Sequence, residues 1–140
     1  MIHRLLVLPL PLLCLALPAA ADPHPIIPCV VERVIDGDTL QATCRPWPGL
    51  VTEARVRILA IDTPERGHRA RCEREAQLAK TATAAAEELL QSSIRIIVEG
   101  RDSFGRSLAH VTLLDHRDYG RVMIERGLAL PYEERSRGWC

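Results

Sequence analysis

The chain has no excess of charge of either sign. Its 140 residues include 18 basic and 18 acidic side chains, so the formal net charge is zero. Proteins that coat nucleic acid without sequence preference depend on strong overall basicity, and this composition excludes that class. Arginine supplies every basic residue except Lys80. Binding to a polyanion would therefore depend on local groups of arginines.

The sequence also lacks an uninterrupted apolar run long enough to cross a membrane. Residues 5–17 are mostly apolar, but two prolines interrupt them, and a span needs about 20 such residues. The small residues Ala19 and Ala21 follow, which is the pattern of a secretory signal with an Ala-x-Ala cleavage site. We expect residues 1–21 to be removed, and residues 22–140 to form one small domain in the periplasm or outside the cell, without membrane contact.

No two cysteines have the C-x-x-C spacing, which makes structural zinc a poor explanation for them. Beyond the expected leader, four cysteines remain: Cys29, Cys44, Cys72 and Cys140. An even number of cysteines in an exported small domain is typical of two disulfides, for which three connectivities are possible.

A hairpin is predicted around the dipeptide Asp36-Gly37, which is favoured in two-residue turns and lies between two β-rich segments. With that turn, Cys29 lies directly opposite Cys44, at a separation that a disulfide can span. The register therefore predicts a bridge between them, unless a β-bulge shifts the pairing, and leaves the other two cysteines as the second pair.

The rest of the chain predicts three further strands and two helices. The strands are expected over 55–61, 94–99 and 106–114, the helices over 73–90 and 119–126, and a proline-rich connection over 45–54. The order is three strands, a helix, two strands and a helix.

Two acidic segments could carry chemistry. In "DGDT", turn geometry explains Asp36, but Asp38 would occupy the first position of a strand, where aspartate is disfavoured. In "DTPE", Asp62 and Glu65 flank Pro64, past which the strand cannot continue. These residues are either an ordinary turn and a polar strand exit, or hard oxygen ligands and a carboxylate base placed around a divalent cation.

Two arginines occupy positions that a phosphate site would use. Arg57 lies within an apolar strand, and Arg106 follows a glycine at the start of another. A strand arginine usually packs its stem on the surface. Two arginines near several carboxylates are also what a site needs in order to hold a phosphate and stabilise charge growing on it.

Together these segments resemble the staphylococcal nuclease (thermonuclease) family. The segments "VIDGDTL", "VRILAIDTPE", "DSFGRSLAHV" and "ERGLA" occur in order and with similar spacing along nearly the whole chain after the leader. The resemblance implies a mainly β, α+β domain, namely an OB-fold: a five-stranded Greek-key barrel with two packed helices. The family's third, C-terminal helix has no counterpart before Cys140, and we expect a Cys72–Cys140 bridge to replace it.

The resemblance also implies roles for single residues. Asp38 and Asp62 match carboxylates that ligate Ca²⁺, and Thr63 matches a residue that offers its backbone carbonyl to the same ion. Glu65 matches the general base, which takes a proton from the attacking water.

Four further residues match the family's contacts to its substrate. Arg57 and Arg106 match the two arginines that bind the scissile phosphate. Phe104 stands where the family has a tyrosine, so stacking is kept and a hydroxyl contact is lost. Tyr132 stands near another tyrosine that meets the nucleotide.

The expected function is that of an exported, calcium-dependent nuclease that cleaves the 5′-oxygen to phosphorus bond in DNA or RNA, with no obligate protein partner. The alternatives are a non-catalytic OB-fold binding module, or an exported accessory protein of envelope or exopolysaccharide production. A degenerate binding module should have lost some of the family's acids and arginines, and none is missing here.

Overall fold

The computed structural model describes residues 24–140. The expected leader, residues 1–21, lies outside the described residues. Among the helices of the described part, none is both long enough and apolar enough to cross a membrane.

Five strands close into a barrel in the order β1-β2-β3-β6-β5. Their bounds are Ile26–Asp36 for β1, Thr39–Trp47 for β2, Leu50–Ile58 for β3, Ser93–Arg101 for β5 and Ser107–Thr112 for β6. All neighbouring strands run antiparallel except β3 and β6, which are parallel. Each strand pairs with a neighbour on both sides over part of its length, and β3 joins β6 only through Val56, Arg57 and Ile58. This confirms the predicted OB-fold.

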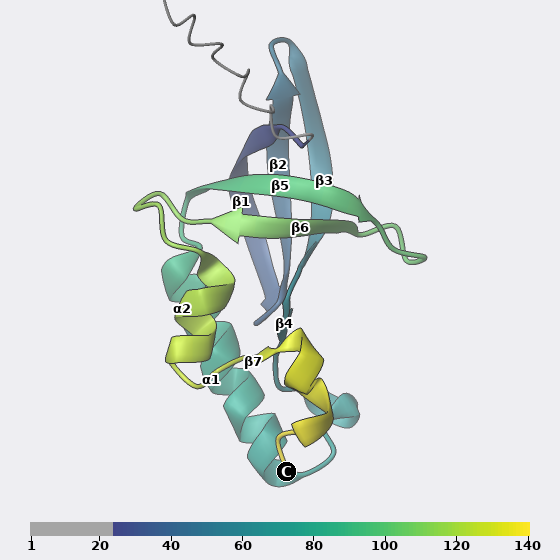
Figure 1. Ribbon diagram of the computed structural model, residues 1–140, viewed down its shortest axis with the longest axis vertical. Coiled ribbons are helices and arrows are strands. Elements are labelled where there is room, and N and C mark those ends of the chain that lie inside the picture. Colours follow the sequence, from purple (N-terminus) through teal and green to yellow (C-terminus); the bar gives the residue numbers. More distant parts are fainter. Residues whose placement is uncertain (1–23) are drawn as a thin grey trace, which may run out of the picture.

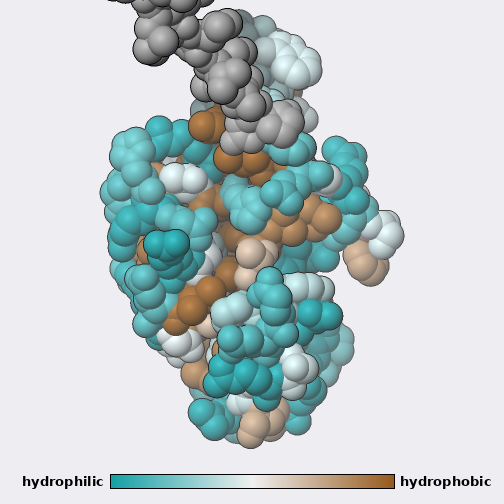
Figure 2. Space-filling model, viewed as in Figure 1, coloured by the Kyte–Doolittle hydropathy of each residue, from teal (hydrophilic) through white to brown (hydrophobic). Residues whose placement is uncertain are grey.

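The helices lie at one end of the barrel, as Figure 1 shows. They are α1 (Glu73–Leu89) and α2 (Tyr119–Glu125). A two-stranded sheet of β4 (Ile61–Asp62) and β7 (Leu130–Pro131) lies beside them, with the short 3₁₀ helices η1 (Gly67–Arg69) and η2 (Tyr132–Arg137). Figure 2 shows that this end is mostly hydrophilic, whereas apolar side chains reach the surface near the middle of the barrel.

The core joins the barrel interior to the inner faces of both helices. Leu40, Val56 and Ala109 are fully buried on neighbouring strands, and α1 contributes mainly alanines, which let the helix approach the barrel closely. Tyr119 of α2 is also fully buried, and its hydroxyl donates to the carbonyl of Gly37 at 2.7 Å. This hydrogen bond connects the β1–β2 turn directly to α2.

The β1–β2 hairpin differs from its prediction at the turn. The two turn residues are Gly37 and Asp38, since Asp36 pairs with Thr39, so the predicted Asp36-Gly37 turn is wrong by one residue. Two bulges in β1 shift the pairing by two residues between the turn and the far end of the hairpin. Together the two bulges bring Cys29 opposite Cys44, which is the pairing that the simple hairpin predicts.

Both predicted disulfides are present. Cys29 and Cys44 are register partners and form one bridge, which is buried in the core. Cys72 and Cys140 form the other across 68 residues of sequence.

The predicted connection over 45–54 is instead a second tight hairpin. β2 continues to Trp47 and β3 begins at Leu50, with Gly49 in the left-handed region at φ 84°. Pro46 is accommodated because the pairing is irregular between Cys44 and Trp47. At its other end β3 stops at Ile58 rather than at residue 61.

Candidate active site

Asp38 lies at the point where the β1–β2 turn meets the strand exit after β3. Its side chain is almost fully buried, and each of its oxygens has a partner. Oδ1 accepts from the hydroxyl of Thr39 at 3.0 Å, and Oδ2 accepts from the hydroxyl of Thr63 at 2.9 Å. The backbone carbonyl of Asp38 accepts from the amide of Ile58 at 2.8 Å, which fixes the turn to the end of β3.

The environment of Asp38 disfavours its negative charge. Burial raises the pKa of this carboxyl from 3.8 to about 6, and the nearby Asp36 adds to the rise, although Arg57 and the Thr63 hydroxyl oppose it. Asp36 is close because its Oδ1 accepts from the amide of Asp38 at 3.2 Å within the turn. A positive charge placed beside these two carboxylates would be favoured.

Arg57 is the cation that lies closest to Asp38. Its Nη2 is 3.2 Å from Oδ2 of Asp38 and donates to the carbonyl of Ile61 at 3.1 Å, while Nη1 donates to the carbonyl of Ile58 at 2.5 Å. These contacts bend the long side chain back along the β3–β4 connection. The guanidinium is thereby held in one place by its own strand end.

Asp62 and Thr63 follow β3 on the strand exit, as predicted, but their side chains face different partners. The Thr63 hydroxyl binds Asp38, whereas Oδ2 of Asp62 accepts from the indole Nε1 of Trp139 at 3.4 Å. Trp139 is buried at the end of the chain. The C-terminal segment therefore reaches one of the carboxylates that the sequence singled out.

Glu65 is half-exposed and pairs with an arginine of its own loop. Nε of Arg69 is 3.2 Å from Oε2 of Glu65, and Nη2 of the same arginine is 4.0 Å from Oδ2 of Asp36. Arg69 thus links the Glu65 loop to the β1–β2 turn. Glu65 is open to exchange this partner, because its own side chain is 48% exposed and that of Arg69 is 59% exposed.

Arg106 is held at the β5–β6 turn by Asp102. Oδ1 of Asp102 accepts from the amides of Phe104 and Arg106 at 3.0 and 2.9 Å, and Oδ2 accepts from Nε of Arg106 at 2.7 Å. Burial acts to raise the pKa of Asp102, but these three hydrogen bonds and the guanidinium charge together lower it below its ordinary value. One carboxylate thus shapes the turn and orients the guanidinium.

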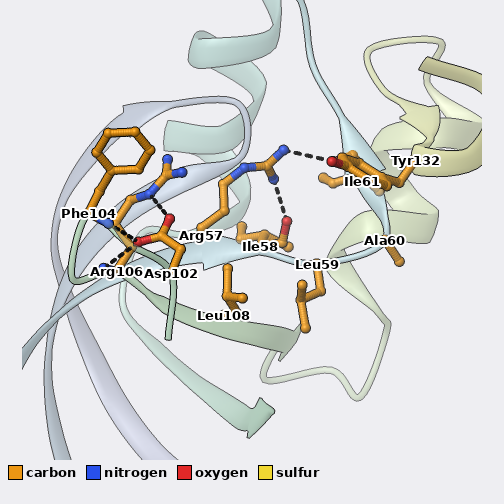
Figure 3. Close-up of a pocket in the computed structure, with 10 residues that line it drawn as sticks. All are labelled: Arg57, Ile58, Leu59, Ala60, Ile61, Asp102, Phe104, Arg106, Leu108 and Tyr132. Carbon is orange, nitrogen blue, oxygen red and sulfur yellow. Dashed lines mark hydrogen bonds and ion pairs between the residues drawn. The ribbon is translucent and has the colours of Figure 1, made fainter. Parts of the chain in front are cut away.

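A pocket of about 390 Å³ brings four of the sequence-predicted residues together: Arg57, Phe104, Arg106 and Tyr132. Figure 3 shows both guanidinium groups along the pocket, with Phe104 at one end and Tyr132 at the other. Its floor is apolar and comes from β3, the β3–β4 connection and β6. The Phe104 ring is 81% exposed and lies 5.7 Å from the guanidinium carbon of Arg106. A ligand with a flat ring and a phosphate could therefore stack its ring on Phe104 while Arg106 binds its phosphate.

The acidic residues have the donor chemistry that a hard metal ion requires. Asp38 and Asp62 offer carboxylate oxygens, which suit a hard cation such as Ca²⁺, and the raised pKa of Asp38 favours a positive charge beside it. Within residues 24–140, however, no three histidine, cysteine, aspartate or glutamate side chains converge as a complete metal site would require. The carboxylate oxygens of Asp38 and Asp62 are thus of the type that Ca²⁺ prefers, and Asp38 is the better placed of the two.

Comparison with known families adds to this geometry. The family model for the staphylococcal nuclease homologue matches residues 55–138, more than half of the chain. The chain belongs to the staphylococcal nuclease family. No curated protein matches the chain. The family match covers Arg57, Asp62, Glu65 and Arg106, and begins after the turn that carries Asp38.

Sequence reasoning missed several residues that this member of the staphylococcal nuclease family places at the site. Arg69 and Trp139 contact candidate carboxylates, whereas the sequence suggested only that the loop arginines could meet phosphates and that the tryptophans pack. Glu75, a fully buried glutamate on α1, was overlooked among the other glutamates of that helix. The one signal for Glu75 is its position: it is a charged residue on the face of the predicted helix that is otherwise apolar.

Proposed function

We propose that the protein is an exported, calcium-dependent nuclease that hydrolyses phosphodiester bonds of DNA or RNA. The observation that carries this proposal is the shared pocket of Arg57 and Arg106, which come from β3 and the β5–β6 turn and meet between two aromatic rings. Two guanidinium groups can donate to the oxygens of one phosphate, and aromatic rings can stack on the adjoining bases. Membership of the staphylococcal nuclease family supports the same activity.

The proposed mechanism assigns different work to the two arginines and to Glu65. Arg57 and Arg106 donate to the phosphate oxygens as negative charge grows on them during in-line attack. Glu65 accepts a proton from the attacking water, and the bond between phosphorus and the 5′-oxygen breaks. Before that step Glu65 must exchange its contact with Arg69 for the water, which the exposure of both side chains permits.

Calcium, held by the carboxylates of Asp38 and Asp62 and the carbonyl of Thr63, would supply Lewis-acid polarisation of a phosphate oxygen. Asp38 is suited to that task because Thr39, Thr63 and Arg57 fix its orientation from three sides. The indole of Trp139 does the same for Asp62. These neighbours orient the proposed ligands, and such partners tune metal affinity.

The decisive experiment is digestion of single-stranded DNA by the purified, oxidised protein in calcium and in chelator. Glu65→Gln removes the proposed base and should lower the cleavage rate strongly. Glu87→Gln is the matched control, because Glu87 is exposed on α1 and the same charge is lost there. Absence of calcium-dependent cleavage above the Glu65→Gln level would contradict the proposal.

The second candidate is a non-catalytic OB-fold module that binds nucleic acid. It is favoured by the engagement of Glu65 with Arg69 and by the lack, within the described residues, of three converging acidic ligands. Binding of a labelled oligonucleotide without any cleavage, in calcium as well as in chelator, would establish it. Export is part of the proposal because two disulfides persist in an oxidising compartment.

A further inference from the structure

Glu75 is the most deeply buried charged residue of the described chain. It lies in the first turn of α1 with 1% of its surface exposed. A buried carboxylate is costly unless hydrogen bonds replace its water, and here both oxygens are occupied. Oε1 accepts from the amide of Glu65 at 3.2 Å, and Oε2 accepts from the amide of Arg71 at 2.7 Å and lies 3.5 Å from its Nε.

These contacts close the loop that carries the proposed general base. Glu65 stands at the beginning of this loop and Arg71 at its end, and the single carboxylate of Glu75 holds both backbone amides. Burial acts to raise the pKa of Glu75, but the two amides and the Arg71 guanidinium together lower it below its ordinary value. At neutral pH both oxygens are therefore acceptors, as the two amides require.

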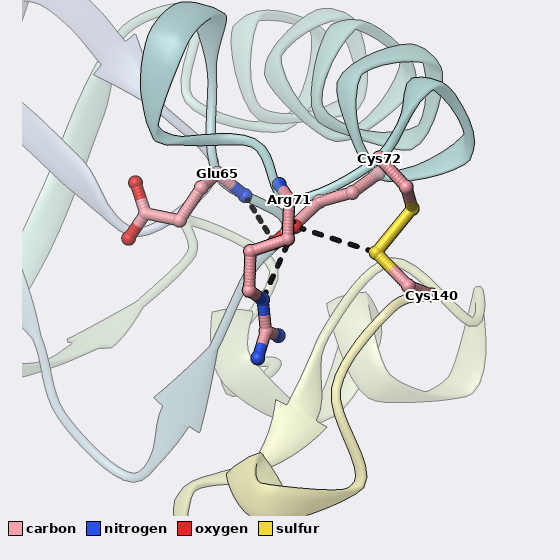
Figure 4. Close-up of a disulfide and its surroundings, with 5 residues drawn as sticks. Glu65, Arg71, Cys72 and Cys140 are labelled. Atoms are coloured by element: carbon pink, nitrogen blue, oxygen red, sulfur yellow. Dashed lines mark hydrogen bonds and ion pairs between the residues drawn. A yellow bond between two sulfur atoms is a disulfide. The ribbon is translucent and has the colours of Figure 1, made fainter.

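The second disulfide fixes the helix turn from which Glu75 projects. Cys72 precedes α1 directly and is bonded to Cys140, and Sγ of Cys140 is 3.8 Å from Oε2 of Glu75. Figure 4 shows the bridge, Arg71 and the backbone of Glu65 grouped around one point, with the Glu65 carboxylate directed away from it. The disulfide thus lies directly beside the carboxylate of Glu75 and ties the start of α1 to the segment that ends at Cys140.

We propose that Glu75 is a positioning residue for the reaction: it sets the backbone of Glu65, and so the place of the carboxylate that accepts the proton from water. This inference rests on the proposed nuclease function. The Glu65 side chain is 48% exposed and pairs with the exposed guanidinium of Arg69, so the backbone of Glu65 determines where its carboxylate can reach. A misplacement of about 1 Å can cost about 100-fold in rate.

The test compares Glu75→Gln with Glu73→Gln. Glutamine keeps the size of Glu75 but presents an NH₂ group to one of the two amides, which cannot then be satisfied. Glu73 lies on the exposed side of the same helix turn, where it accepts from Gln77, so its substitution removes the same charge without touching the loop. We expect kcat to fall about 10- to 100-fold in Glu75→Gln with KM nearly unchanged, and no change in Glu73→Gln.

A double variant separates positioning from general structural support. In the Glu65→Gln background the base is already lost, so Glu75→Gln should reduce the residual rate no further. Amide hydrogen exchange gives a readout without activity: the Glu65 amide should exchange faster in Glu75→Gln than in wild type. If Glu75→Gln does not fold, Glu75→Asp is used instead. Aspartate keeps the charge and both acceptor oxygens, but its side chain is one methylene shorter, so the oxygens lie farther from the two amides.

The outcomes distinguish this inference from the nuclease proposal. If wild type and Glu73→Gln cleave DNA and Glu75→Gln cleaves it equally well, the positioning role is wrong and the nuclease stands. If Glu75→Gln lowers the cleavage rate by the same factor in wild type and in the Glu65→Gln variant, the role of Glu75 is merely structural and the inference is wrong. If wild type itself does not cleave, the nuclease proposal fails and the positioning role falls with it.

Discussion

Trp139 donates its indole N–H to Asp62 across 77 residues of sequence, at 3.4 Å. The bond joins the segment after η2 to the exit of β3, where the proposed ligands lie. The segment that carries Trp139 is closed by the disulfide between Cys72 and Cys140. The C-terminal segment is therefore part of the candidate site rather than an appendage to the barrel.

Replacing Trp139 by phenylalanine tests that connection. Phenylalanine keeps most of the buried packing but cannot donate to Asp62, so the carboxylate would be free to rotate. Loss of such a partner typically lowers metal affinity or activity about 10- to 100-fold, and we expect the low end because the bond is long. The measurement is cleavage rate against calcium concentration. Trp47→Phe, at an exposed site on the β2–β3 turn, should leave the calcium dependence unchanged.

Asp38→Asn should stabilise the protein in chelator at neutral pH. The folded-state pKa of about 6 lies above the ordinary value of 3.8, so the native state binds more protons than the unfolded state between these values. The free energy of unfolding therefore falls as pH rises from about 4 to about 6, and the ionised carboxyl costs up to about 3 kcal/mol above that window.

The measurement for Asp38→Asn is urea denaturation at pH 7.5 and at pH 4. The variant should be more stable than wild type at pH 7.5, and this advantage should shrink at pH 4, where wild-type Asp38 is protonated. Loss of the partner of Arg57 will offset part of the gain. A variant less stable than wild type at pH 7.5 would contradict the assignment of a strained carboxylate.

Asp102→Asn should reduce kcat by about tenfold, because Arg106 loses the acceptor that orients its Nε. The chain offers a close control in Asp115, which accepts from the amide and Nε of Arg117 at 3.2 and 2.8 Å in an exposed turn away from the pocket. Asp115→Asn should lose a similar ion pair without a change in rate. Equal rates for the two variants would mean that Asp102 has no part in catalysis.

Phe104→Ala should raise KM for oligonucleotides while leaving thermal stability nearly unchanged. The ring is exposed, so little packing is lost, whereas stacking of a base on an aromatic ring is worth about 1–3 kcal/mol. Phe104→Tyr keeps the ring and should retain the wild-type KM. Trp47→Ala removes another exposed aromatic ring outside the pocket, and a matching rise in KM there would indicate nonspecific binding.

The order of the strands and helices could be predicted from the sequence because their signals are local, whereas the barrel was implied by the resemblance to the staphylococcal nuclease family. Alternating strands, turn residues and the two helix patterns each occur within a few residues, and their order matches the observed fold. The turn at Gly37-Asp38 could not be predicted, because two bulges in β1 shift the pairing and the residues of that strand give no local signal for them. The predicted Cys29–Cys44 bridge is present because the two bulges offset the one-residue error in the turn and bring the cysteines opposite each other.

The candidate site was predictable only in part, for a physical reason. Arg57 and Arg106 stand out locally, as charges at the ends of apolar strands. Glu75 does not, since in the sequence it is one of several glutamates on a helix and only tertiary packing turns it toward the loop. Contacts between segments distant in sequence, such as that of Trp139 with Asp62, leave no periodic or spacing signal.

The bridge between Cys72 and Cys140 closes a covalent ring that contains α1, β5, β6 and α2. A protease that cuts once within this ring, for example at the exposed β5–β6 turn, leaves both fragments attached to one another. The first three strands lie outside the ring and are held to it by the pairing of β1 with β5 and of β3 with β6. After a single nick the two fragments would therefore stay covalently joined until the bridge was reduced.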